Sequence, residues 1–216
     1  WFVHGFRVDG RGLCEVAETI FTEQLDYNRK FLEADGCKRV AFEDGYLTVK
    51  DFRAYEAMPV EWVPFGAEIS MPRMYKSAKE IVSLQAAQSI ADKSFLEWLG
   101  RIGVGMSELE ATAELNYVCA KNGSEAPSFD PIIAAGPNGA MPHAVPGTRK
   151  MQKGDLVTAD FGCMVNGYHS DMTRTFAIGA IDSESREIYE IVKTAQQMAL
   201  NALKSGIHGK ALDAVA

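Results

Sequence analysis

Apolar and polar positions in the first 65 residues predict short strands that alternate with helices. The strands are expected at 1–8, 39–42 and 60–63, and the helices at 13–25 and 49–58. Thr48 is placed to cap the second helix, because threonine favours that position. An alternation of this kind predicts a small α/β unit. A cluster of chain-breaking residues then marks a domain boundary near residue 70: Pro59, Pro64, Gly66 and Pro72.

From residue 77 onward the pattern changes to longer helices on either side of a predicted hairpin. An apolar stripe of helical period covers 77–100. Ser107 and Glu110 have the spacing of a capping box, which predicts a second helix from there to about residue 120. A third helix is expected to begin at Asp182 or Ser183 and to end at Gly206. We therefore expect a mixed α/β (α+β) fold with two domains, 1–70 and 71–216.

The hairpin is expected between residues 156 and 178. Leu156 to Phe161 has the apolar, β-branched character of a buried strand, and 168–178 is the returning strand. Asn166 and Gly167 between them both tolerate the positive φ that a tight primed turn requires. If these two residues alone form the loop, Val165 pairs with Tyr168. A four-residue loop would change the pairing.

Two carboxylates in this hairpin, Asp160 and Asp171, are the first candidates for chemistry. In the two-residue loop they are diagonal neighbours, and in the four-residue loop they lie directly opposite. Either register puts both on the same face of the strands. Two buried like charges repel unless a positive charge lies between them, and a divalent cation would supply it. Alternatively, one acid caps a turn and the other pairs with Arg174. Spacing alone leaves both readings open.

His143 lies in the loop 137–147, which has three prolines and two glycines and is therefore irregular but stiff. A histidine there has no helical face on which to pack, and loops on a rigid scaffold carry many functional residues. We therefore interpret His143 as a functional residue. The alternative is a ring that only bonds nearby backbone.

Composition narrows the class of protein. Hydrophobic residues make up 47% of the 216 residues, which is typical of a globular chain with a core. The net charge is −7 without any basic run, so a nucleic-acid partner or an anionic membrane surface is not expected. No apolar run has the length of a membrane span. The four cysteines show no paired spacing, which favours reduced thiols and a cytoplasmic location.

The second half resembles the pita-bread metallopeptidases, in the branch of aminopeptidase P, Xaa-Pro dipeptidase (prolidase) and creatinase. The resemblance rests on three segments: SFDPIIAAGPNGAMPHAVPGT at 128–148, GDLVTADFGCMVNGYHSDMTRTFAIG at 154–179 and SREIYEIVKTAQQMAL at 185–200. Residues 1–65 resemble the later part of the creatinase-type N-terminal domain. On this basis 1–70 is a partial N-terminal domain and 71–216 the first half of the pita-bread domain. The chain then looks truncated at both ends.

The resemblance implies a hydrolase of Xaa-Pro peptide bonds. Asp171 would contact two divalent metal ions and Asp160 one of them, with manganese expected first and cobalt or zinc as alternatives. A metal-bridging hydroxide would attack the peptide carbonyl, and His143 would hydrogen-bond near that carbonyl. The substrate would be a peptide or dipeptide with proline at its second position, and the protein a homodimer. Three further ligands of the family, a histidine and two glutamates, have no counterpart in these residues.

Two other functions remain open on the sequence. A pita-bread domain can serve as a catalytically inactive binding module, but such members typically lose their ligand residues. A creatinase-like hydrolase would cleave a C–N bond without the metals. The presence of both Asp160 and Asp171 counts against each of these alternatives.

Overall fold

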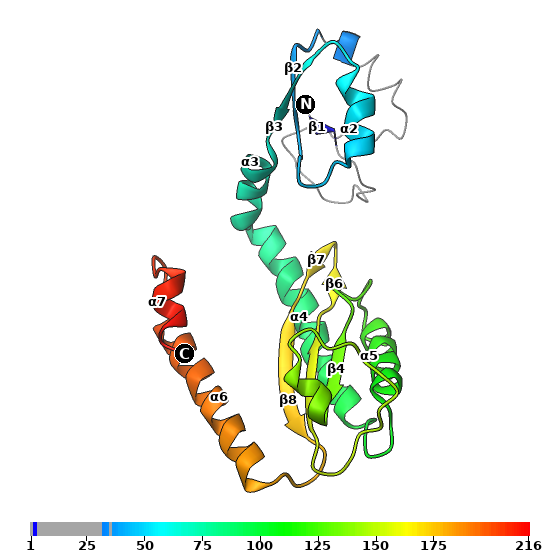
Figure 1. The fold of residues 1–216 in the computed structure, drawn as a ribbon, viewed down its shortest axis with the longest axis vertical. Helices are drawn as coiled ribbons and strands as arrows, with labels where there is room; N and C mark the ends of the chain where they lie inside the picture. The colour runs from blue at the N-terminus through cyan, green and yellow to red at the C-terminus, as the bar shows by residue number, and fades with distance from the viewer. Residues whose placement is uncertain (1, 4–31, 35) are drawn as a thin grey trace. The chain divides into compact units, whose positions relative to one another are not determined.

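The computed structural model describes residues 2–3, 32–34 and 36–216, which belong to two compact units, Trp1–Ser83 and Leu84–Ala216 (Figure 1). The predicted helix over 13–25 and most of the predicted strand over 1–8 lie outside the described residues. The domain division after residue 70 stays a prediction.

The first unit contains a parallel three-stranded sheet in the order β1 (Phe2–Val3), β2 (Arg39–Phe42) and β3 (Glu61–Pro64). Helix α2 (Val49–Glu56) connects β2 to β3, and Thr48 caps it by accepting a hydrogen bond from the amide of Asp51 at 3.2 Å. Helix α3 (Gly66–Ser70) and the 3₁₀ helix η1 (Met71–Met74) follow. A parallel pair joined through a helix is the α/β unit that the sequence predicts.

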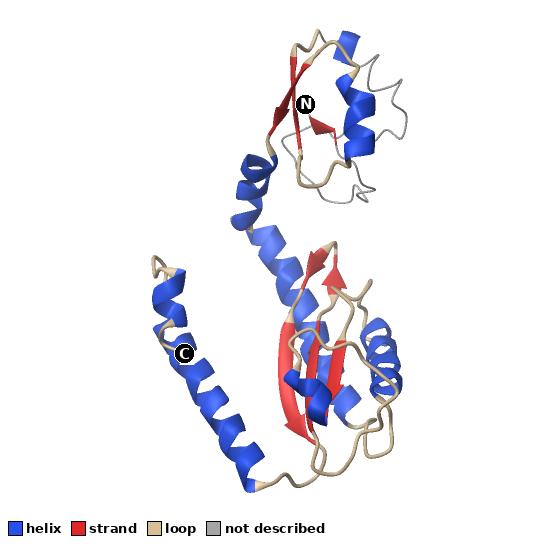
Figure 2. Cartoon of the chain, in the orientation of Figure 1, coloured by secondary structure: helices blue, strands red, loops and turns tan. Residues whose placement is uncertain are grey.

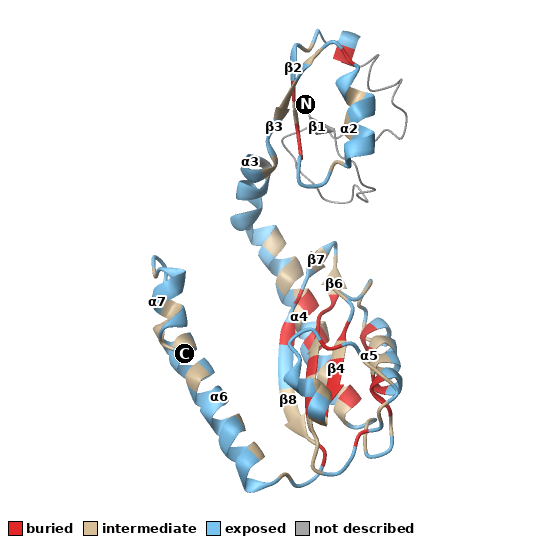
Figure 3. Cartoon of the chain, in the orientation of Figure 1, coloured by how far each residue is buried: buried red, intermediate tan, exposed pale blue. Residues whose placement is uncertain are grey.

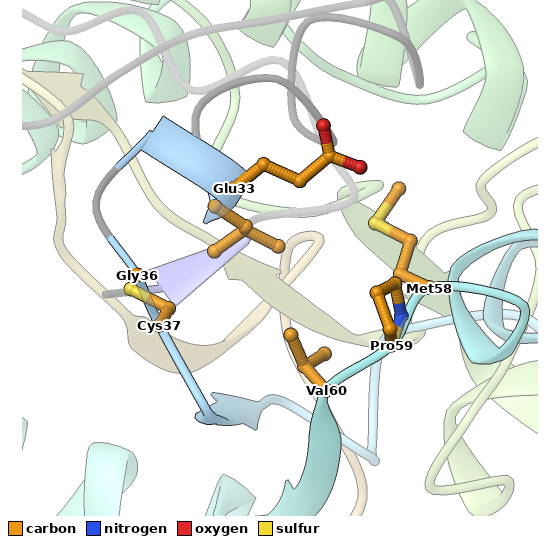
Figure 4. A pocket seen from close by; sticks show the side chains of 7 residues that line it. Glu33, Gly36, Cys37, Met58, Pro59 and Val60 are labelled. Atoms are coloured by element: carbon orange, nitrogen blue, oxygen red, sulfur yellow. The ribbon is translucent and has the colours of Figure 1, made fainter.

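A hollow of about 170 Å³ lies in this unit beside the end of α2 (Figure 4). Leu32, Met58 and Val60 give it an apolar lining, and Glu33 is the one charged residue among the described residues that line it. None of the candidate functional residues borders this hollow, because all of them lie in the second unit.

The second unit is built on an antiparallel sheet in the order β4 (Ile132–Ala135), β5 (Leu156–Phe161) and β8 (Met172–Ala177). A two-stranded ribbon, β6 (Met164–Val165) and β7 (Tyr168–His169), extends β5 and β8 beyond the sheet (Figure 2). The 3₁₀ helix η2 (Gly136–Ala140) follows β4. The central strand β5 therefore has partners on both sides.

Two helices, α4 (Ala78–Leu99) and α5 (Glu108–Lys121), cover one face of this sheet. Val157, Ala159 and Phe161 of β5 alternate with half-buried residues and join the core between sheet and helices. Figure 3 shows buried segments in the sheet and in the two helices. The indole of Trp98 donates a 2.8 Å hydrogen bond to the Ala111 carbonyl and so ties the two helices together. The predicted capping box of α5 is present.

Helix α6 (Ser183–Ala202) and the short α7 (Gly209–Asp213) end the chain. Asp182 caps α6 as expected, but the helix ends at Ala202 rather than at Gly206, because Leu203 is already extended, with ψ 122°. Neither helix has a buried residue, and several large apolar side chains of α6 are exposed: Ile188, Ile191, Val192, Met198 and Leu200. In the described part of the chain no helix has both the length and the apolarity to cross a membrane.

Candidate metal and peptide site

The turn between β6 and β7 has the geometry predicted from its two residues. Asn166 has φ 51° and Gly167 has φ 76°, and Val165 pairs with Tyr168. Both central residues thus have the positive φ of a type I′ turn. The two-residue loop is therefore correct, and the alternative with four residues is wrong.

The sequence predicts one continuous returning strand over 168–178. In the structure this strand is divided into β7 and β8 at Ser170 and Asp171. The hydroxyl of Ser170 accepts a hydrogen bond from the amide of Cys163 at 2.9 Å, where a regular ladder would use a backbone carbonyl. The strands also come close here: a Cβ on Gly162 would overlap the Ser170 carbonyl and lie 2.7 Å from Ser128 Oγ. Only glycine fits at position 162. The residue type at this position therefore permits the close approach of the two strands beside the break between β7 and β8.

The register places Asp160 and Asp171 on the same face. Asp160 pairs with Thr173, and Asp171 lies two residues before Thr173, directly before β8 begins at Met172, so the pairing register puts all three on one face. The Thr173 hydroxyl donates a 2.8 Å hydrogen bond to Asp160 Oδ1. The two acids are thus the diagonal neighbours that the two-residue turn predicts.

The expectation that both acids are buried is wrong for this chain. Asp160 is half-buried and Asp171 is exposed. They alternate with the core residues of β5 and β8, so they lie on the face opposite to α4 and α5. Their side chains consequently face outward, where a ligand can reach them.

The alternative pairing with Arg174 is absent. Arg174 is exposed, and its guanidinium donates to the Thr173 carbonyl at 2.8 Å. Among the described residues no ion pair joins it to Asp160 or Asp171. Arg174 therefore occupies neither carboxylate.

The loop with His143 begins on the face of the sheet that carries Asp160. It begins at η2, and a Cβ on Gly139 would lie 3.8 Å from Thr158 Oγ1, a side chain on the same face of β5 as Asp160. His143 is exposed, and its imidazole has no hydrogen bond with any other described residue. The alternative in which the ring only bonds nearby backbone is therefore not what the structure contains.

Glu108, at the first position of α5, is a residue that sequence reasoning missed. Its side chain is 1% exposed, although it stands at the start of a helix that the sequence predicts only from its capping box. Its carboxylate accepts hydrogen bonds from the amides of Ala135 and Gly147, both at 2.8 Å. These residues flank the His143 loop. The sequence places Glu108 beside a capping box, where an acid is ordinarily read as a helix N-terminal charge.

A bidentate ion pair between Arg149 and Asp155 lies just beyond the loop. The two guanidinium nitrogens of Arg149 donate to the two carboxylate oxygens of Asp155 at 2.7 and 2.9 Å. The Arg149 guanidinium is the main reason why the pKa of Asp155 is lowered, and the Gln152 amide lowers it further. Gly136 has φ 56°, and a Cβ there would lie 2.7 Å from both partners. The entrance to the loop is therefore packed against this pair.

Comparison with known proteins identifies the family. The sequence signature of peptidase M24, metallopeptidase family M24, matches residues 82–216. This chain belongs to metallopeptidase family M24. An M24 relative, the Xaa-Pro dipeptidase of Pyrococcus furiosus, is 42% identical over 144 residues, which are 67% of this chain and 41% of that protein.

Solved M24 structures agree with the fold. The Xaa-Pro dipeptidase from Bacillus anthracis matches with a TM-score of 0.85 at 37% identity, over 88% of this chain and 54% of that chain. The X-Pro aminopeptidase from Thermotoga maritima MSB8 matches with a TM-score of 0.83 at 32% identity, over 92% and 57%. The predicted family and the predicted partial pita-bread α/β fold are thereby confirmed. The chain spans about half the length of these relatives.

Membership of M24 implies divalent metal ions, and the donors present here fit them. Two carboxylates on one outward face are the oxygen ligands that such ions take. Residues 2–3, 32–34 and 36–216 nevertheless contain no group of three or more His, Cys, Asp or Glu side chains that could hold a metal. The assignment of Asp160 and Asp171 as metal ligands stays a prediction. The homodimer and the cytoplasmic location stay predictions.

Proposed function

We propose that this protein is a metal-dependent peptidase that hydrolyses Xaa-Pro bonds, with Asp160 and Asp171 as metal ligands and His143 as a substrate-contacting residue. The observation that carries the proposal is the convergence of the two carboxylates and the His143 loop on the one face of the sheet that α4 and α5 leave open. The similarity to Xaa-Pro dipeptidases supports the bond specificity.

In this proposal each residue of the site has a separate role. Asp160 and Asp171 would hold the cations on the open face, and the Thr173 hydroxyl would fix the orientation of Asp160. A divalent ion held by these two carboxylates would supply Lewis-acid chemistry for peptide hydrolysis. His143, with a free imidazole on a stiff loop, would hydrogen-bond the substrate beside its scissile carbonyl. Manganese is the metal that we propose, with cobalt and zinc as alternatives.

The experiment that tests this function is hydrolysis of Ala-Pro by the full-length protein, first freed of metal and then supplied with Mn²⁺, Co²⁺ or Zn²⁺ in turn. We expect activity that depends on the metal and is greatest with Mn²⁺. Ala-Ala serves as the control substrate, because it lacks the proline ring. If no metal supports hydrolysis of Ala-Pro or of a longer Xaa-Pro peptide, the proposed function is wrong.

A second assay separates the two activities known among the relatives. A dipeptidase should strongly prefer Ala-Pro over Ala-Pro-Ala, whereas an aminopeptidase should accept both. We propose a dipeptide or short peptide with proline at the second position as the substrate, and the ratio of kcat/KM for these two compounds decides between them.

A further inference from the structure

We propose that Glu108 is a positioning residue, which ties the two ends of loop 136–147 together and thereby places the His143 imidazole over the open face. This inference rests on the proposed peptidase function, in which His143 contacts the substrate. Glu108 itself would touch neither substrate nor metal, since its side chain is 1% exposed.

The two oxygens of Glu108 accept hydrogen bonds from both ends of the loop. Oε1 accepts from the amide of Ala135, the last residue of β4, at 2.8 Å. Oε2 accepts from the amide of Gly147 at 2.8 Å. One rigid carboxylate thus fixes the distance between the point where the chain leaves the sheet and the point where it returns to α5.

Asn138 extends this connection into the loop. Its side-chain amide donates to Glu108 Oε2 at 2.9 Å and to the Val145 carbonyl at 3.3 Å. The two arms of the loop are thereby joined on either side of His143. Ala144, directly after the histidine, is 3% exposed and so anchors the tip. The backbone on both sides of His143 is held, while the imidazole itself stays exposed.

A carboxylate is the side chain that this position requires. Three N–H groups converge on its two oxygens, and a buried carboxylate is tolerable when such donors and a helix N-terminus surround it. A glutamine would turn an NH₂ group toward at least one of those donors. Within the described chain Glu108 has no ion-pair partner within contact distance, although the charge of the Arg149 guanidinium interacts with it.

The direct test is a double-mutant cycle in the full-length protein with Mn²⁺ and Ala-Pro. We expect Glu108→Gln to lower kcat/KM by about tenfold to a hundredfold, chiefly through kcat, since displacing a contacting group costs rates of this size. In the His143→Ala background the same change should cost less than about twofold, because its effect acts through the histidine. Equal losses in both backgrounds would overturn the proposal.

Glu110 offers a matched control in the same turn of α5. Its carboxylate accepts from the Ser107 amide at 2.7 Å and completes the capping box, but it has no hydrogen bond to the loop. Glu110→Gln removes the same charge and weakens the helix start, yet it should leave kcat/KM within about twofold of the wild type. A loss as large as that of Glu108→Gln would mean that helix stability, and not the loop, controls the rate, which contradicts the proposal.

A measurement without catalysis keeps this inference separate from the proposed function. Amide hydrogen exchange at Ala135 and Gly147 should become at least about tenfold faster in Glu108→Gln, while the core amide of Leu115 stays protected. Unchanged exchange at both amides refutes the connection even if the enzyme is active. Faster exchange in a protein that hydrolyses no Xaa-Pro bond would support the connection and reject the peptidase.

A second variant guards against failure of Glu108→Gln to fold. Asn138→Ala leaves Glu108 and its two backbone donors in place and removes the side-chain amide that donates both to Glu108 Oε2 and to the Val145 carbonyl. It should lower kcat and speed exchange in the same direction, by a smaller factor. If it changes neither quantity, the link through the loop does not position His143.

Discussion

The hydroxyl of Thr173 donates a 2.8 Å hydrogen bond to Oδ1 of Asp160, its partner across the β5–β8 ladder. The second oxygen of Asp160 accepts no hydrogen bond from the residues that the structure describes. One oxygen is therefore oriented by the protein, and the other is left for a ligand. A metal-binding carboxylate is commonly held in this way by a neighbouring polar group.

Thr173→Val should weaken metal binding. Valine keeps the β-branched shape but has no hydroxyl, so Asp160 loses its orienting donor. We expect the dissociation constant for Mn²⁺ to rise about tenfold in a calorimetric titration of the full-length protein. Thr175→Val is the control, because Thr175 lies on the same face and contacts Thr158 Oγ1 at 3.4 Å instead. An equal effect of both substitutions would contradict this role of Thr173.

Asp171→Asn should abolish metal binding and peptidase activity without harming the metal-free fold. The exposed Asp171 side chain makes no hydrogen bond with the described residues, so the free energy of unfolding should change by less than about 0.5 kcal/mol. Urea unfolding of the metal-free protein and a Mn²⁺ titration check the two parts. A variant that retains full activity would remove Asp171 from the set of ligands.

Gly162→Ala should destabilise the protein by about 3 kcal/mol. A Cβ at this position would overlap the Ser170 carbonyl, which is backbone and cannot rotate away. Gly103→Ala is the matched control, because nothing lies within 4 Å of a Cβ there. The difference between their urea midpoints measures the close approach of the strands. Similar midpoints would show that the strands separate at low cost.

The turn at Asn166 makes a prediction of its own. Asn166 has φ 51°, a conformation that costs a β-branched residue about 1–2 kcal/mol and costs glycine little. Asn166→Val should therefore lower the free energy of unfolding by at least that amount, whereas Asn166→Gly should lie close to the wild type. The opposite order in thermal unfolding would rule out this turn geometry.

An acid-sensitive contribution to stability is expected from Glu97. The Lys121 ammonium, 2.6 Å from Oε1, is the main cause that lowers the pKa of Glu97 from 4.5 to about 2, with further lowering by Asn122 and Arg101. Since the folded pKa lies below the unfolded one, the contribution is complete above pH 4.5 and disappears as the pH falls toward 2.

Urea unfolding of the wild type and of Glu97→Gln at pH 6 and pH 3 measures this contribution. The stability difference between the two proteins should be smaller at about pH 3 than at about pH 6. A difference that is the same at both pH values would mean that the ion pairs do not bias folding.

Local rules were sufficient for the elements that depend on neighbours in sequence. The caps at Thr48 and Ser107, the turn at Asn166 and the parity of the two acids all follow from spacing and backbone preference. The family also followed from motifs within the second half.

Features that depend on distant residues could not be read in this way. Glu108 contacts residues 27, 30 and 39 positions away, and Gly162 is required because Ser128 and Ser170 converge on it. The exposure of Asp171 depends on which face of the sheet the helices cover. Each of these features arises from the packing of segments that are distant in sequence, so a local sequence pattern does not predict it.

The hairpin register has a consequence for how the length of this segment can vary. Pairing continues without a slip from Phe161–Met172 to Val165–Tyr168, four residues further along each strand. A single residue inserted between Asp171 and Met172 would rotate Asp171 to the opposite face of the sheet. Homologous chains that keep the carboxylate pair should therefore differ here by none or by an even number of residues. To keep the two carboxylates on one face, this segment must therefore conserve its length as well as the two acids.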